Sequence, residues 1–280
     1  MLDRAILTKN EAEKIINTQN LGHSQVFLSL DLGKSQEKVI LTPPFVLLCN
    51  QKILLKELEK LKENTIYVAE DNTLKSIDFF SNDTNLYYKL KPTHDWPTLT
   101  ISSVPMHRFK QISPKTSAEL MVKEIAPVKG LILDTCCGLG YTSILLSKEA
   151  EKVFTFEKDS NVLRIAEYNP YSKKLFNNPK IELVNNSILE GIKSFENNYF
   201  DRVLHDPPTT SFGEELYSKS FYLDLFRVMK RGALLYHYCP NPGKTKGQEF
   251  FPLLIKRLEE AGFSNCKYNK NSSGIKAQKK

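Results

Sequence analysis

The chain has 280 residues, of which 41% are hydrophobic, and a formal net charge of +7. This length allows one large domain or two ordinary domains with a full core. The sequence has no run of eighteen apolar residues and no apolar signal segment after Met1, so we expect a cytoplasmic protein without a membrane span. Five scattered cysteines argue against a disulfide framework, and no His/Cys cluster offers four ligands, so we expect no structural metal.

The first hundred residues predict a small α+β domain. Thr8 is followed by Glu11 at the spacing of a capping box, which predicts a helix over residues 8–19. Apolar periodicity predicts a second helix over 52–61 and strands over 26–32, 39–41, 66–68, 74–79, 86–90 and 99–101. We expect this domain, residues 1–104, to select a substrate or to cover an active site.

The rest of the chain predicts an α/β fold. Residues 105–130 are expected to form a linker and a leading helix, which begins at Ser113-Pro114. Strands and helices then alternate, with strands over 131–134, 152–157, 181–184, 201–205 and 233–239, helices over 141–149, 160–168, 187–194, 215–230 and 248–261, and a last strand pair over 263–268 and 273–278. Such alternation predicts a mostly parallel sheet with helices on both faces in residues 131–280, and ligands at the carboxyl ends of its strands.

The segment around Asp134 predicts a binding loop. The apolar run 131–133 ends in this carboxylate, passes through Gly138 and Gly140, and enters the apolar helix start 144–146. Glycines let a backbone approach a ligand closely, and a helix N-terminus offers unpaired N–H groups. The pattern is typical of a site for the charged part of a nucleotide-like cofactor.

Two later strand ends extend this hypothesis. Glu157 lies nineteen residues after Gly138, where an acidic residue can bond both ribose hydroxyls, although a solvated carboxylate at a strand end fits the pattern equally. The run Asp206-Pro207-Pro208 follows the predicted strand 201–205. Since proline has no N–H, this turn presents acceptors but few donors, which suits an amino substrate. The alternative is a rigid turn without chemistry.

The order and spacing of these three motifs resemble those of class I S-adenosylmethionine-dependent methyltransferases. The loop from Asp134 to Thr142 is most similar to that of an archaeal group of predicted methyltransferases with an extra N-terminal domain. The resemblance implies a Rossmann-like fold with a seven-stranded sheet, and S-adenosyl-L-methionine as the cofactor. It implies cofactor contacts from Asp134, Cys136, Gly138, Gly140, Tyr141, Glu157, Lys158, Asn186, Ser187 and Asp206.

The same resemblance implies that Asp206, Pro207 and Pro208 face the methyl acceptor, with His107 as a proton acceptor. For His107 and Arg108 a linker turn with a surface ion pair stays open as the alternative. The candidate substrate contacts are Arg108, Phe212, Tyr217, His237 and Lys244.

Two positions depart from the family pattern. Thr209 stands where amino-directed nucleic-acid methyltransferases usually carry a stacking aromatic ring, which Phe212 or Tyr217 would have to supply. Asn186 lies where an acidic residue often contacts adenine, but its amide can still accept a hydrogen bond. Cys239 ends a predicted strand where a thiolate nucleophile could act, although such cysteines are usually packing residues.

The distribution of net charge along the chain gives evidence about the methyl acceptor. Residues 111–280 carry a net +6 and residues 1–110 a net +1, and the segment from residue 263 holds five lysines without a carboxylate. A basic surface attracts RNA, while biased composition explains the excess equally well. The leading hypothesis is N-methylation of an amino group on RNA, and a small-molecule amine is the second candidate acceptor. A spermidine-synthase-like aminopropyltransferase and a non-catalytic RNA-binding subunit that retains the fold also fit the sequence, and the oligomeric state is left open.

Overall fold

The computed structural model describes residues 4–239 and 247–280, the side chains of 247–249 excepted. The chain divides into two compact units: unit 1 is Met1–Pro114 with Arg164–Lys173, and unit 2 is Lys115–Leu163 with Lys174–Lys280. Unit 1 therefore extends past residue 104 and takes in a segment that the sequence pattern assigns to the second domain. Within the described residues, no helix is long and apolar enough to cross a bilayer.

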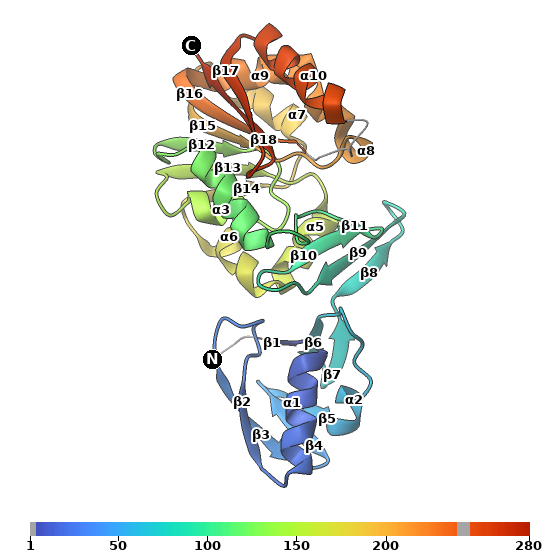
Figure 1. Cartoon of the computed structure of the whole chain (residues 1–280). Helices are drawn as coiled ribbons and strands as arrows, with labels where there is room; N and C mark the ends of the chain where they lie inside the picture. Colours follow the sequence, from blue (N-terminus) through green and yellow to red (C-terminus); the bar gives the residue numbers. More distant parts are fainter. Residues whose placement is uncertain (1–3, 240–246) are drawn as a thin grey trace. The chain divides into compact units, whose positions relative to one another are not determined.

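Unit 1 is an α+β unit built from small antiparallel sheets (Figure 1). Over its described residues the sheets have the orders β1-β6-β7, β2-β3-β4-β5 and β11-β10-β9-β8. The elements are β1 (Ala5–Leu7), α1 (Lys9–Asn20), β2 (Gln25–Leu28), β3 (Glu37–Thr42), β4 (Phe45–Leu48), β5 (Gln51–Leu54), α2 (Leu55–Leu58), β6 (Tyr67–Glu70), β7 (Thr73–Ser76), β8 (Asp78–Ser81), β9 (Leu86–Lys91), β10 (Thr98–Ile101) and β11 (Val104–Pro105).

The capping box at the start of α1 is confirmed. Thr8 accepts a hydrogen bond from the Asn10 N–H, and Glu11 accepts one from the Thr8 N–H. Ala12 and Ile15 of this helix are fully buried in the core of unit 1. A local motif that satisfies its own backbone donors is readable without knowledge of distant contacts.

The predicted helix over 52–61 is wrong. Residues Gln51–Leu54 form strand β5, which pairs antiparallel with β4, and only Leu55–Leu58 are helical. Leu55 and Leu58 are buried as the helical pattern requires, so the periodicity identifies buried residues but not the backbone state. Cys49 at φ +54° turns the chain between β4 and β5, and cross-strand pairing then prevails over local helix propensity.

The predicted strand 74–79 is two strands in different sheets. β7 pairs with β6 and β8 pairs with β9. Buried Ile77 lies between them, donating its N–H to the Ile66 carbonyl and accepting from the Leu90 N–H. Because Ile77 is apolar and buried like a strand residue, the sequence gives no sign that the predicted strand ends there and a second one begins.

Unit 2 has the predicted α/β architecture. Its sheet has seven strands within the described residues, in the order β14-β13-β12-β15-β16-β18-β17, and β18 runs antiparallel to both of its neighbours. The strands are β12 (Leu131–Asp134), β13 (Lys152–Phe156), β14 (Ile181–Val184), β15 (Phe200–His205), β16 (Met229–Tyr238), β17 (Phe263–Asn269) and β18 (Gly274–Lys279). The α-helices of residues 114–280 are α3 (Pro114–Glu124), α4 (Tyr141–Leu146), α5 (Ser160–Tyr168), α6 (Lys173–Asn177), α7 (Ile188–Gly191), α8 (Thr210–Gly213), α9 (Lys219–Val228) and α10 (Gly247–Glu260). The part of α5 from Arg164 onward and the first residues of α3 and α6 belong to unit 1.

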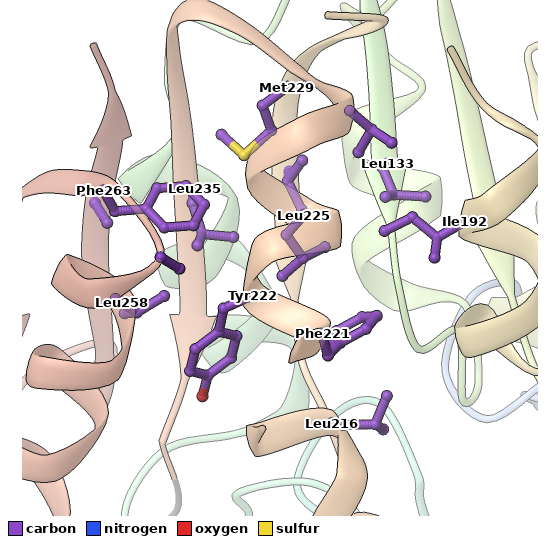
Figure 2. Close-up of a cluster of buried hydrophobic side chains, with 14 of the residues drawn as sticks. Leu133, Ile192, Leu216, Phe221, Tyr222, Leu225, Met229, Leu235, Leu258 and Phe263 are labelled. Carbon is purple, nitrogen blue, oxygen red and sulfur yellow. The ribbon is translucent and has the colours of Figure 1, made fainter. Parts of the chain in front are cut away.

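Alternating strand residues bury both faces of this sheet. On one face Leu133 and Leu235 pack with Leu225 of α9 and Leu258 of α10, as Figure 2 shows. On the other face Ile132 packs with residues of α3 and α4. Because both faces are covered by helices, functional side chains are confined to the strand ends and the loops.

The basic C-terminal segment is largely structural. Strand β18 lies between β16 and β17, so it forms the interior of the sheet. Lys279 is only 8% exposed, and its ammonium donates to the Phe226 carbonyl at 2.7 Å and to Asn198 Oδ1 at 3.0 Å. Phe226 lies in the last turn of α9, where carbonyls lack helical partners and a cation is favourable.

This contact yields a stability prediction. We expect Lys279→Met to lower the free energy of unfolding by about 1–3 kcal/mol, because it removes the hydrogen bonds that the charged ammonium of this largely buried side chain donates. Urea denaturation measures the change. The matched control is Lys280→Met, whose side chain is exposed and which should change stability by less than about 0.5 kcal/mol. Equal effects of the two substitutions would show that Lys279 has no special role.

Candidate functional site

Asp134 forms the centre of the first loop. Its side chain is fully buried at the end of β12, and its Oδ2 accepts hydrogen bonds from Thr142 at 2.8 Å and Ser143 at 2.5 Å. Among the described residues Asp134 Oδ1 has no hydrogen-bond partner. Burial raises the pKa of Asp134 to about 6, and the hydroxyls of Ser143, Thr142 and Thr155 with the Cys136 N–H oppose that shift. The carboxylate therefore ties β12 to α4.

The two glycines of this loop have different surroundings. Gly138 and Gly140 have φ of +54° and +77°, in the left-handed region that favours glycine. A Cβ at Gly138 would meet nothing within 4 Å, whereas a Cβ at Gly140 would lie 2.7 Å from Leu175 Cδ2. Gly138 therefore borders open space, and Gly140 is needed for packing against α6.

Glu157 connects the first loop to the next strand ends. It directly follows β13, and its two carboxylate oxygens accept from the Gly138 N–H at 2.9 Å and from the Asp159 N–H at 3.0 Å. The Asn185 amide, after β14, donates to the Glu157 carbonyl at 2.7 Å. Burial raises the pKa of Glu157. The ends of β12, β13 and β14 are thus bonded together at one edge of the sheet.

The Asp206-Pro207-Pro208 turn leaves the sheet beside the Asp134 loop, because β15 pairs in parallel with β12. Burial, and then the negative charge of Asp134, raise the pKa of Asp206 to about 8. The Tyr217 hydroxyl donates to the Pro208 carbonyl at 2.7 Å, which fixes the turn.

Carboxyl groups that follow or end three strands of this edge influence the same thiol. The thiol of half-buried Cys136 has a pKa well above its usual value, because of burial and then the charges of Glu157, Asp206 and Asp134. Over the described part of the chain, no three His, Cys, Asp or Glu side chains are grouped so as to hold a metal ion. Negative charges that raise one another's pKa favour a cationic ligand at this edge.

Two buried histidines lie beneath the Asp-Pro-Pro turn. His205 donates from Nε2 to the Leu216 carbonyl at 3.0 Å and accepts the Thr135 hydroxyl at 2.7 Å. His237 donates from Nδ1 to the Tyr238 carbonyl at 2.8 Å, and its Nε2 lies 2.7 Å from the Tyr222 hydroxyl. The two rings are 4.5 Å apart between centroids.

This arrangement corrects the predicted role of His237 as a substrate contact. The ring is fully buried with both nitrogens bonded, so it supports the turn from the core. Burial lowers the pKa of His205 to about 3 and that of His237 well below its usual value, which keeps both neutral. From the sequence, His205 at the end of the predicted strand 201–205 could face either the core or a pocket. No sequence motif marks Tyr222.

The predicted acceptor contacts are brought together only in part. Lys158 donates from its ammonium to the Phe212 carbonyl at 3.3 Å, and the Phe212 side chain is half-buried. Tyr217 is 1% exposed, so its ring cannot stack on a base without rearrangement. Thr209 is the N-cap residue of α8. Lys244 lies outside the described residues.

The remaining candidates serve local structure as well. Exposed Asn186 accepts the Ser187 N–H at 2.7 Å, and the Ser187 hydroxyl caps α7 through the Leu189 N–H. Tyr141 is buried in the first turn of α4. Burial raises the pKa of the Cys239 thiol far above its usual value, which disfavours a thiolate nucleophile.

His107 and Arg108 belong to unit 1. The Nδ1 of His107 lies 3.1 Å from the Thr98 hydroxyl, and burial lowers the pKa of His107 to about 4. The ring is therefore neutral near pH 7. The roles of these two residues toward an acceptor stay predictions.

Comparisons with known proteins identify the family. The family model of the methyltransferase small domain matches residues 109–220. An uncharacterized protein of Methanocaldococcus jannaschii is 35% identical over 287 residues, covering 98% of this chain and 95% of that protein. An uncharacterized RNA methyltransferase of Bacillus cereus is 27% identical over 225 residues, or 76% of this chain. The chain spans only 45% of the length of that second relative.

Among solved structures, spermidine synthase from Thermotoga maritima has a TM-score of 0.57 at 16% identity, with 72% of each chain covered. A spermidine synthase bound to a transition state analogue has a TM-score of 0.56 at 19% identity, covering 70% of this chain and 71% of that one. At these identities the likeness shows the fold alone. From the sheet order, the three strand-end motifs and the family matches, we conclude that the chain belongs to the class I S-adenosylmethionine-dependent methyltransferases.

Proposed function

We propose that this methyltransferase N-methylates an amino group, with RNA favoured as the acceptor. The observation that supports it most is the Asp206-Pro207-Pro208 turn, rich in acceptors and lying beside the Asp134 loop. An amine lone pair is already nucleophilic, so such a site needs to position the amine more than to deprotonate it with a strong base.

The residues of the loop fit S-adenosylmethionine, which supplies an electrophilic methyl group on a sulfonium when bound. Asp134 Oδ1, without a partner among the described residues, can accept a hydrogen bond from a cationic ligand. The open space at Gly138 leaves room for close backbone approach. Glu157 would hold the ribose and Asn186 the adenine, in keeping with their strand-end positions.

Asp206 would orient the acceptor. Its carboxylate and the Pro207 carbonyl can accept the amine hydrogens, since the Pro208 carbonyl already receives the Tyr217 hydroxyl. As the N–CH₃ bond forms, the S–CH₃ bond breaks and the nitrogen sheds a proton. An ionised Asp206 can receive that proton at its carboxylate.

Three features support RNA as the acceptor. The Bacillus cereus relative is described as an RNA methyltransferase, residues 111–280 carry a net +6, and Lys267, Lys270 and Lys280 are exposed. The absence of an aromatic ring at position 209 favours a small-molecule amine instead. Removing residues 270–280 would not separate the two, because that deletion takes away the inner strand β18.

The different surroundings of the two glycines predict separable effects. Gly138→Ala should weaken S-adenosylhomocysteine binding at least tenfold, because its methyl enters the open space, at a backbone cost of roughly 1–2 kcal/mol. Gly140→Ala is the matched control: it carries the same backbone strain but also collides with Leu175, so it should lose more stability. Calorimetric titration and urea denaturation measure the two effects. Unchanged affinity of folded Gly138→Ala would refute a cofactor at this glycine.

The proposed roles of two carboxylates can be separated by kinetics. We expect Asp206→Ala to lower methyl transfer by on the order of a hundredfold and leave S-adenosylhomocysteine affinity within a few-fold, since only acceptor orientation is lost. Glu157→Ala should instead weaken the cofactor through lost ribose bonds. Loss of cofactor binding in Asp206→Ala with normal turnover would reverse the assignment.

The pH profile provides a control for Asp206. Because its pKa is raised to about 8, the carboxyl is mostly protonated at pH 7 in the free enzyme and ionised above pH 8. For a nucleobase amine, kcat/KM should therefore rise with pH and level off above about 8. Asp206→Asn should lack this rise, and a rise retained in that variant would have to come from another group.

Transfer of labelled methyl decides the acceptor. The full chain, incubated with methyl-labelled S-adenosylmethionine and either bulk tRNA and ribosomal RNA or a pool of small amines, should label the RNA. Nuclease digestion should then release an N-methylated nucleoside. Label that enters only the small-amine pool contradicts RNA, and label in neither pool contradicts N-methylation of both acceptor classes.

A further inference from the structure

One face of the four-stranded sheet β2-β3-β4-β5 is exposed although it carries large apolar residues. Phe27 is 65%, Ile40 45% and Leu47 44% exposed, while Val39 and Val46 on the other face are buried in the core of unit 1. These side chains alternate as a sheet with one covered face requires. We call the exposed side the outer face, with Phe27, Lys38, Ile40, Phe45, Leu47 and Lys52 on it.

The register places these residues as one contiguous surface. Ile40 lies directly opposite Leu47 at the centre, and Phe27 lies opposite Lys38 at one end. At the other end the Lys52 ammonium lies 4.5 Å from the centre of the Phe45 ring. Each phenylalanine is thus accompanied by a lysine, across an apolar centre. A contiguous apolar surface of this kind marks an interaction site, unlike single scattered residues.

A hollow opens at the end of the sheet where Lys38 lies. It has a volume of 170 Å³, and its walls combine Lys38, Ile40 and Leu47 of the outer face with core residues Leu30 and Val39 and with Glu37, Cys49 and Asn50. Apolar walls with a few hydrogen-bonding groups suit a flat heterocycle whose edge carries donors and acceptors. The hollow therefore offers a place for one unstacked base.

The charge of the outer face indicates which kind of partner it binds. In strands β2 to β5, all of whose residues the structure describes, the outward-facing charged side chains are Lys38 and Lys52. The carboxylate of these strands, Glu37, pairs with buried Leu28 on the other face and lines the hollow at the end of the sheet. In a symmetric contact with a second copy the same patch appears on both partners, so lysines would gather between the two. A polyanion with aromatic bases matches both the lysines and the phenylalanines.

We propose that the outer face binds a single-stranded segment of RNA, with bases stacked on Phe27 and Phe45 and phosphates near Lys38 and Lys52. The inference rests on the proposed function and names the surface by which unit 1 engages the RNA acceptor. On this inference unit 1 helps to select the substrate through residues of its own, separate from the strand-end motifs of unit 2.

The test uses the full chain and a labelled uridine 20-mer, with a duplex of equal length for comparison. The wild type should bind the single strand more tightly than the duplex. Phe27→Ala should weaken single-strand binding about tenfold, through loss of a stacking ring. Phe27→Leu, which keeps an apolar side chain, should weaken it similarly and guards against misfolding. Lys38→Glu should weaken binding. It should also make the fall of log affinity with log salt concentration less steep, by about 0.7 or more in the slope.

The controls carry the same changes elsewhere in unit 1: Phe80→Ala on β8, where the residue is 54% exposed, and Lys56→Glu on α2. Both should bind within twofold of the wild type. Wild-type affinity and salt slope in Phe27→Ala and Lys38→Glu would overturn the inference, even if RNA is methylated. A wild-type dimer that Phe27→Ala makes monomeric, with unchanged RNA affinity, would assign the face to a second copy and overturn it too. RNA binding that depends on Phe27, without methyl transfer to RNA, would refute the proposed function alone.

Discussion

The site depends on one buried carboxylate. Asp134 is ionisable and fully buried, and a buried charge is costly unless it is hydrogen-bonded. The Thr142 and Ser143 hydroxyls satisfy one of its oxygens and thereby anchor the first turn of α4 to the end of β12. The loop between the two elements, with Gly138 at its open side, takes its course from this anchor.

The same charge acts beyond its own loop. Asp134 contributes to the raised pKa of Asp206 across the β12–β15 pair, and Glu157 holds the Gly138 N–H from the next strand. The three carboxyl groups are therefore most stable together when a cation is present or when one of them is neutral. A sulfonium cofactor provides such a cation, so affinity for it and the ionisation of the site are expected to be linked.

Much of unit 2 is predictable, because its determinants are local or periodic. The alternation of strands and helices, the glycine loop, and Glu157 and Asp206 at strand ends follow from spacing in the sequence, and the structure has them at one edge of the sheet. Unit 1 is less predictable. The leucines at 54, 55, 58 and 61 have helical spacing, yet residues 51–54 pair with β4, which precedes them across a turn. Short strands joined in small sheets depend on such non-local pairing.

The interior polar residues are the hardest to assign. Their sequence context predicts His237 at the substrate and Lys279 on a basic surface, but both lie in the interior of unit 2 with their hydrogen-bonding groups engaged. A sequence indicates that a residue can bond, and not whether its partner is a ligand or a buried carbonyl. For His237 the partner Tyr222 is fifteen residues away on another element, and for Lys279 the partner carbonyl is on α9.

The place of β18 between β16 and β17 has a consequence for how the chain folds during synthesis. After β16 has left the ribosome, one of its edges has no partner until α10, β17 and then β18 have followed. An unpaired strand edge is a site for wrong pairing and aggregation. The nascent chain is thus exposed to misassembly for the time needed to translate this stretch, and the half of the sheet that holds β12 to β15 can form well before its last members arrive.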